Sequence, residues 1–187
     1  MKKLLLILPL VFLLCFAFSY QQGEELVKEV PAKETLRVGT FDSRAIAVAY
    51  LRSEPVEQLV SNHFEKLNKA KEEGDEKLVK ELEALGQAYQ QVQHQQGFST
   101  ASVAEYLEKV KAELPKIAED AGVDIIVSKW EVIYRNPSIE IVDVTSHLVK
   151  LFNPDERTLE IIEELLEQAP MPLLDLLIEI RKEQKEK

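Results

Sequence analysis

Apolar and polar residues follow two different periods along this chain of 187 residues. Apolar residues recur at every second position over 36–41, 123–128 and 130–134, a period that predicts half-buried strands. They recur every three or four positions over 56–94 and 101–121, a period that predicts amphipathic helices. The pattern therefore predicts one strand, about 80 residues of helix, two further strands and a closing helix.

Specific residues mark where the predicted helices begin and end. Asp42 or Ser43 is expected to cap the helix that follows the first strand, and Pro55 is expected to interrupt or restart that helix. Gly74 is expected to end one long helix, with Asp75 capping the next, because glycine readily adopts the left-handed conformation that ends helices. The long insertion is thus expected to contain several helices.

The helical insertion, about residues 55–122, predicts a helical hairpin. Gly97-Phe98-Ser99-Thr100 is interpreted as its turn, and the longer segment before this turn must bend at Gly74 or Gly86 if the two sides are to pair. An amphipathic arm cannot bury its apolar stripe alone, so it needs self-pairing, a partner subunit or a client. An extended arm and a compact helical cap both agree with this pattern.

Residues 1–19 are predicted to be a cleaved secretory signal peptide. Lys2 and Lys3 precede an apolar run, and Ala17-Phe18-Ser19 forms a small-x-small cleavage motif. The prediction is therefore export to the periplasm, and the alternative is an inner-membrane anchor formed by an uncleaved signal. Residues 20–35 are polar with little periodicity and are predicted to be a flexible spacer.

The charge of the chain limits the classes of partner. The full chain has 23 basic and 33 acidic residues, a net charge of −10. Residues 1–19 contain two Lys, no acid and the one cysteine, so the remaining chain has 21 basic and 33 acidic residues and a net charge of −12. This acidity argues against nucleic-acid binding, which needs Lys and Arg to neutralise phosphates. An acidic, solvated surface is the commoner explanation of such a charge, and binding of basic client segments is the alternative. Loss of the cysteine removes disulfides and thiol chemistry from the mature protein.

Residues 153–187 are predicted to be a C-terminal helical extension. Asn153-Pro154-Asp155-Glu156 is typical of a helix start, and Pro170-Met171-Pro172 breaks the helix that follows. Residues 173–187 then form a short, very apolar helix with a charged end. We expect this helix to pack against the core, with a partner-binding or membrane-surface helix as the alternative.

The sequence contains no pattern typical of an enzyme active site, so no catalytic residue, cofactor or metal ligand is predicted. His63, His94 and His147 are scattered and lack the spacing of a metal-binding motif. No phosphate-binding glycine loop and no serine nucleophile motif is present. The carboxylates lie on predicted helix faces, where pairs with Lys four residues away explain them.

Three segments follow the insertion in a distinctive order, namely AGVDIIV at 121–127, WEVIYRNP at 130–137 and IEIVDVT at 139–145. Together with the signal peptide, the first strand and the helical arms, they resemble the Skp/OmpH family of periplasmic chaperones. The resemblance covers about residues 36–152, which we treat as one domain. It implies a homotrimer whose sheets form a shared body and whose coiled-coil arms enclose unfolded outer-membrane proteins.

These observations predict an α+β fold, with a small β-sheet body, a long helical-hairpin insertion and the C-terminal helical extension. The predicted function is an exported, ATP-independent holdase chaperone that binds unfolded outer-membrane or envelope proteins. A structural or adaptor protein of the cell envelope, with the same fold and no client-holding activity, is the alternative. The residues predicted to contact clients are Phe64, Tyr89, Phe98 and Tyr106, and for each the alternative is packing between helices.

Overall fold

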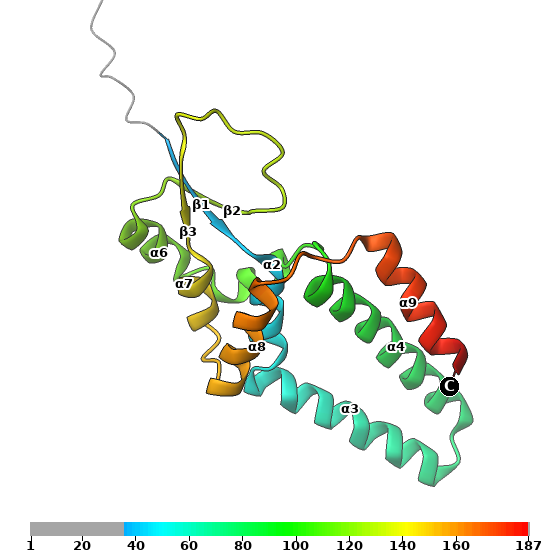
Figure 1. The fold of residues 1–187 in the computed structure, drawn as a ribbon. Helices are drawn as coiled ribbons and strands as arrows, with labels where there is room; N and C mark the ends of the chain where they lie inside the picture. Colours follow the sequence, from blue (N-terminus) through cyan, green and yellow to red (C-terminus); the bar gives the residue numbers. More distant parts are fainter. Residues whose placement is uncertain (1–35, 187) are drawn as a thin grey trace, which may run out of the picture. The chain divides into compact units, whose positions relative to one another are not determined.

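The computed structural model describes residues 36–186, which belong to one unit. In this part of the chain, eight α-helices and three β-strands form a mixed α+β fold (Figure 1), which confirms the predicted fold class. The predicted signal peptide (1–19) and spacer (20–35) lie outside the described residues, and both stay predictions.

The sheet has three parallel strands in the order β2-β1-β3. They are β1 (Arg37–Phe41), β2 (Ile125–Ser128) and β3 (Glu140–Asp143). Val38 of the central strand lies opposite the first residue of β2 on one side and the second residue of β3 on the other. Parallel neighbours require long crossover connections, and the helical insertion supplies the crossover between β1 and β2.

The prediction of a strand over 130–134 is wrong. These residues form a turn and an irregular segment, and the third strand of the sheet is β3, which pairs with the free side of β1. The reason is the parallel arrangement. After β2, the chain must return to the starting end of the sheet before it can add another parallel strand, and residues 129–139 make that return (Figure 1).

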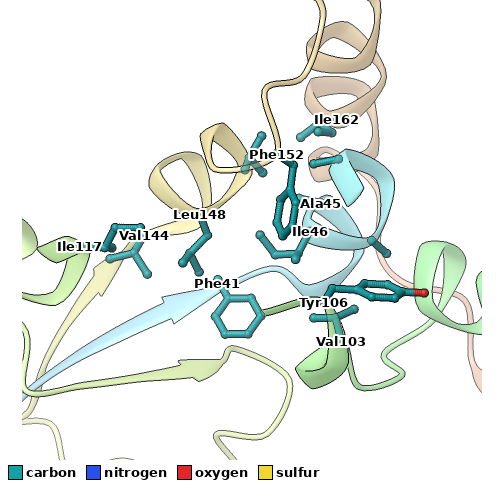
Figure 2. Close-up of a cluster of buried hydrophobic side chains, with 13 residues drawn as sticks. Phe41, Ala45, Ile46, Val103, Tyr106, Ile117, Val144, Leu148, Phe152 and Ile162 are labelled. Atoms are coloured by element: carbon teal, nitrogen blue, oxygen red, sulfur yellow. The ribbon is translucent and has the colours of Figure 1, made fainter. Parts of the chain in front are cut away.

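The hydrophobic core joins the sheet to helices from both halves of the chain (Figure 2). Its centre is α2 (Ser43–Leu51), which follows β1 and is capped by Asp42, one of the two predicted caps. Alternate alanines along α2 are fully buried, so neighbouring elements approach it closely. The largest buried apolar side chains of the cluster are Phe41, Ile46, Tyr106, Ile117, Leu148, Phe152 and Ile162.

The insertion contains a true helical hairpin, formed by α3 (Glu54–Glu73) and α4 (Glu76–Phe98). Pro55 lies in the first turn of α3, where its missing N–H is harmless, so it restarts the helix as predicted. Gly74 has a positive φ of 71° and ends α3, and the Asp75 side chain accepts a hydrogen bond from Leu78 N at the start of α4. Both boundary predictions are confirmed.

The hairpin turns at Gly74 rather than at Gly97–Thr100, so the predicted position of the turn is wrong. Residues 97–100 instead lie where α4 ends at the body of the protein. The chain then continues through three short helices, α5 (Ala104–Leu107), a 3₁₀ turn (Glu108–Val110) and α6 (Leu114–Ala121). The arm is therefore α3 against α4, and the later helices belong to the body.

The C-terminal region divides into two helices with different surroundings. The first, α8 (Glu156–Leu166), is capped by Asp155 and packs on α2, and its Ile162 belongs to the main core. The second, α9 (Leu173–Glu186), follows the break at Pro170-Met171-Pro172 and lies along α4 (Figure 1). Only α8 therefore packs in the core of the body.

Candidate functional site: the exposed apolar face of a helical hairpin

The two helices of the hairpin meet along a narrow seam. Leu67 and Ala70 of α3 are buried, and Lys71 of α3 forms an ion pair with Glu83 of α4 at 3.0 Å. His63 lies above Gly86, since a Cβ on that glycine would come within 3.2 Å of His63 Nε2. A small residue at position 86 thus allows the helices to approach closely.

The apolar stripe of α3 is wider than this seam. Leu59, Val60 and Phe64 carry large apolar side chains and are exposed, although they belong to the same helical repeat as the buried Leu67. Val60 and Phe64 are four residues apart, so they lie one above the other on one flank. The pairing with α4 therefore leaves an apolar flank of α3 uncovered.

A similar exposed row runs along α4. Its members are separated by seven, four and three residues, a spacing that keeps them on one side of a helix. They are Leu78, Leu85, Tyr89 and Val92. Together with Leu59, Val60 and Phe64 they form what we call the hairpin surface, and its seven side chains are between 38% and 64% exposed.

Charge is distributed unevenly along the hairpin. Residues 54–98 contain nine acidic and five basic residues, a net charge of −4. All of the charges on α4 fall between its start and Glu83, whereas residues 84–98 contain no Asp, Glu, Lys or Arg. The half of α4 nearest the body thus carries exposed apolar side chains on an uncharged, glutamine-rich background.

The structure separates the four predicted client-contact residues into three environments. Phe64 and Tyr89 belong to the hairpin surface. Phe98 is also exposed, but it lies at the base of the arm, where its ring contacts His94 edge to face. Tyr106 is buried in the core, so the alternative interpretation, packing between elements, holds for this residue.

Tyr106 is held by specific contacts inside the body. Its ring stacks on Tyr50 with 4.1 Å between centroids, and its hydroxyl donates a hydrogen bond to Gln96 Oε1. Burial, with a smaller effect of Glu105, raises the pKa of the Tyr106 phenol to about 12. The residue anchors the base of α4 to the body and is excluded from the contact surface.

Periodicity in the sequence identified the other hairpin-surface residues as apolar positions but not as exposed ones. Leu59, Leu78 and Leu85 fall on the apolar stripes that the helical period over 56–94 predicts, and such a stripe is normally covered by another element. Here α3 pairs with α4, and α4 also contacts α2 and α9, but these neighbours cover only part of each stripe. Exposure of the flanks depends on how many helices surround the arm, which periodicity does not encode.

A cluster of charged side chains lies at the carboxyl end of the sheet, apart from the hairpin surface. The Asp42 carboxylate is fully buried and accepts hydrogen bonds from Arg44 and Lys129, at 2.8 Å and 2.9 Å. Burial alone would raise the pKa of Asp42, but the hydrogen bonds from these two cations outweigh it and hold the pKa below its usual value. Both cations also lie over the ring of Trp130. The three charged groups of this cluster satisfy one another, which points to a structural role, whereas the Trp130 indole N–H and the Ser43 hydroxyl are buried without a hydrogen-bond partner.

The described residues offer few other sites. Within residues 36–186, no group of three His, Cys, Asp or Glu side chains is arranged to hold a metal ion. Over the same range, no helix is both long and apolar enough to cross a membrane. The hairpin surface is therefore the candidate functional site.

Comparison of the chain with protein-family models, with curated proteins and with solved structures gave no match. The resemblance to the Skp/OmpH family therefore stays a prediction from the sequence.

Proposed function

We propose that this protein is an exported, ATP-independent holdase chaperone that binds unfolded outer-membrane or envelope proteins along its helical hairpin. One observation carries the proposal, namely the seven large apolar side chains exposed on the two helices of the hairpin surface. The pair Val60 and Phe64 and the row from Leu78 to Val92 each keep to one side of their helix, and large exposed apolar areas on soluble proteins typically mark interaction sites. An unfolded chain presents the complementary chemistry, because its apolar residues are not yet buried.

The acidity of the arm supports clients that carry basic residues near their apolar segments. Its net charge of −4 attracts such segments, while the uncharged half of α4 leaves apolar contacts free of competing charges. The attraction is screened beyond about 8 Å at physiological ionic strength. Client binding is therefore expected to weaken as salt rises.

Self-assembly belongs to the same proposal. Ile133 and Tyr134 lie in the irregular segment after β2 and are 92% and 81% exposed, which suits a surface that another copy of the chain covers. The sheet also has two outer strands, β2 and β3, and proteins tend to pair or cover such edges. We propose a homo-oligomer built through this segment, with the trimer implied by the family resemblance as its size.

Suppression of aggregation tests the holdase function. A urea-denatured β-barrel protein is diluted into buffer, and light scattering is followed with and without the protein. We expect the unaltered chain to suppress scattering and the double variant Phe64→Gln/Tyr89→Gln to lose most of the protection, because both side chains belong to the hairpin surface.

The matched control is Leu159→Gln/Leu166→Gln, which removes two exposed apolar side chains of α8, away from the arm. The control should protect as well as the unaltered chain. Equal protection by all three proteins would remove the hairpin from the mechanism. An absence of protection by the unaltered chain would instead favour the structural or adaptor protein.

A further inference from the structure

The C-terminal helix α9 lies on the arm whose surface is proposed to hold clients. It packs against α4, with Leu176 and Ile180 buried, at 4% and 9% exposure. These two residues are four apart and so face α4 together. Leu173, Leu174 and Ile178 of the same helix are exposed. The helix therefore uses a narrow apolar stripe to dock.

The direction and level of docking follow from one backbone contact. Met171 N donates a hydrogen bond to Phe98 O at 2.8 Å, which ties the start of α9 to the end of α4. From there α9 runs back along α4 toward the tip of the hairpin (Figure 1). Because both helices rise about 1.5 Å per residue, Leu176 lies at about the level of residue 93 and Ile180 at about the level of residue 89.

The docked helix matches the charge pattern of α4. Residues 173–180 of α9, which are six apolar residues with Asp175 and Glu179 between them, lie along the half of α4 that has no charged residue (84–98). Arg181 and Lys182 then begin the charged end of α9 in the direction of residues 75–83, which have four acidic and two basic residues. The apolar side chains thus meet an uncharged surface, and Arg181 and Lys182, at about the levels of residues 88 and 87, lie on the side of α9 nearer the acidic residues 75–83.

We propose that α9 is a self-docked segment that occupies one face of the uncharged half of α4, a face other than the one on which Leu85, Tyr89 and Val92 stay exposed, and that it competes there with client segments of the same pattern, an apolar stretch followed by basic residues. This inference rests on the proposed holdase function and names both the client chemistry and its regulation. The docking is suited to displacement, because two buried side chains, the half-buried Leu177 and one backbone hydrogen bond hold α9, while Leu173, Leu174 and Ile178 stay exposed.

The test compares a release variant with a matched control in the chain from Tyr20 to Lys187. The release variant is Leu176→Asp/Ile180→Asp, which places two charges against α4. The control is Leu174→Asp/Ile178→Asp, which places the same charges on the exposed side of the same helix. Hydrogen exchange should become faster over 173–180 in the release variant and stay unchanged in the control.

The probe is a fluorescein-labelled peptide with the sequence of residues 170–187, and its binding is measured by fluorescence anisotropy. If α9 is docked in nine of ten molecules, the release variant should bind the peptide about tenfold more tightly than the unaltered chain, since affinity scales with the fraction of competent molecules. The control should bind like the unaltered chain. Equal affinities, with α9 shown to be undocked by hydrogen exchange, would overturn the proposal.

A second measurement separates this inference from the holdase function. A urea-denatured β-barrel protein should displace the labelled peptide from the release variant, and it should speed exchange over 173–180 in the unaltered chain. One outcome is that the barrel protein is protected from aggregation and yet neither displaces the peptide nor speeds exchange over 173–180. In that case clients bind elsewhere, and only the proposed competition with α9 is overturned. If no variant protects the barrel protein, the holdase function itself is wrong, and the competition falls with it.

Discussion

At the scale of single residues, the buried Asp42 has the largest structural consequences. It caps α2 through Arg44 N and also neutralises the Arg44 guanidinium, whose side chain is 3% exposed. A buried cation without its counter-ion is costly, whereas the same carboxylate at an exposed cap contributes little beyond its hydrogen bond. Replacing Asp42 and replacing the exposed cap Asp155 should therefore lower the free energy of unfolding by different amounts.

We predict that Asp42→Asn lowers the free energy of unfolding by about 3 kcal/mol at neutral pH, because it leaves Arg44 buried without a counter-charge. Asp155→Asn should cost much less, since asparagine also caps helices well and Asp155 neutralises no buried cation. Urea denaturation of both variants measures the difference. Similar losses in the two proteins would contradict the role assigned to the buried pair.

The pH dependence of stability follows from the same group. The folded pKa of Asp42 lies below its usual value of 3.8. The unfolded chain therefore binds the proton first, so the contribution of Asp42 is complete above about pH 4 and is lost as the pH falls through the folded pKa. In Asp42→Asn, the decline of stability below pH 4 should be shallower than in the unaltered chain.

At the scale of secondary-structure elements, two glycines end helices under different constraints. Gly74 and Gly122 both have positive φ, at 71° and 62°, and end α3 and α6. A Cβ at Gly74 would meet nothing within 4 Å, whereas a Cβ at Gly122 would lie 2.5 Å from Arg37 Nη1. The Arg37 side chain also donates a hydrogen bond to Gly122 O at 2.7 Å, joining α6 to β1.

We predict that Gly74→Ala costs about 1 kcal/mol of unfolding free energy, the usual strain of the left-handed conformation. Gly122→Ala should cost more, because the same strain is joined by displacement of Arg37 from its contact with Gly122 O. Thermal unfolding of both variants, followed by circular dichroism, gives the comparison. A larger loss at position 74 would contradict the argument.

At the scale of the whole molecule, the proposed assembly depends on a segment that the single chain does not use. Ile133 packs against nothing that covers it, so its replacement should leave the fold of the body intact. We predict that Ile133→Asp changes the unfolding free energy by less than about 0.5 kcal/mol but reduces the assembly to monomers. A buried charge at the subunit contact is costly, while the same charge on the free chain is solvated.

Light scattering coupled to size-exclusion chromatography measures the mass, and Leu159→Asp on α8 is the control that should keep the assembly. A monomeric unaltered chain at high micromolar concentration would refute the assembly proposal. An Ile133→Asp variant with unchanged mass would move the contact to another surface.

The sequence by itself determined the local features of the described residues. The period of two marked β1 and β2, and Asp42, Pro55, Gly74 and Asp75 marked helix ends, because capping and left-handed turns depend on the residue at one position. The candidate site was predictable in part, since Phe64 and Tyr89 were recognised as apolar arm residues.

Only the tertiary structure decided which elements meet. Residues 130–134 have the period of a strand, but the parallel sheet required them as a connection, so Ile133 became exposed. Tyr106 has the same helical spacing as Tyr89, yet Tyr50 and Gln96 enclose Tyr106 and no neighbour encloses Tyr89. The docking of α9 on α4 likewise joins segments about 80 residues apart. Period and composition describe a side chain's own helix or strand, whereas burial depends on the distant segments that pack against it.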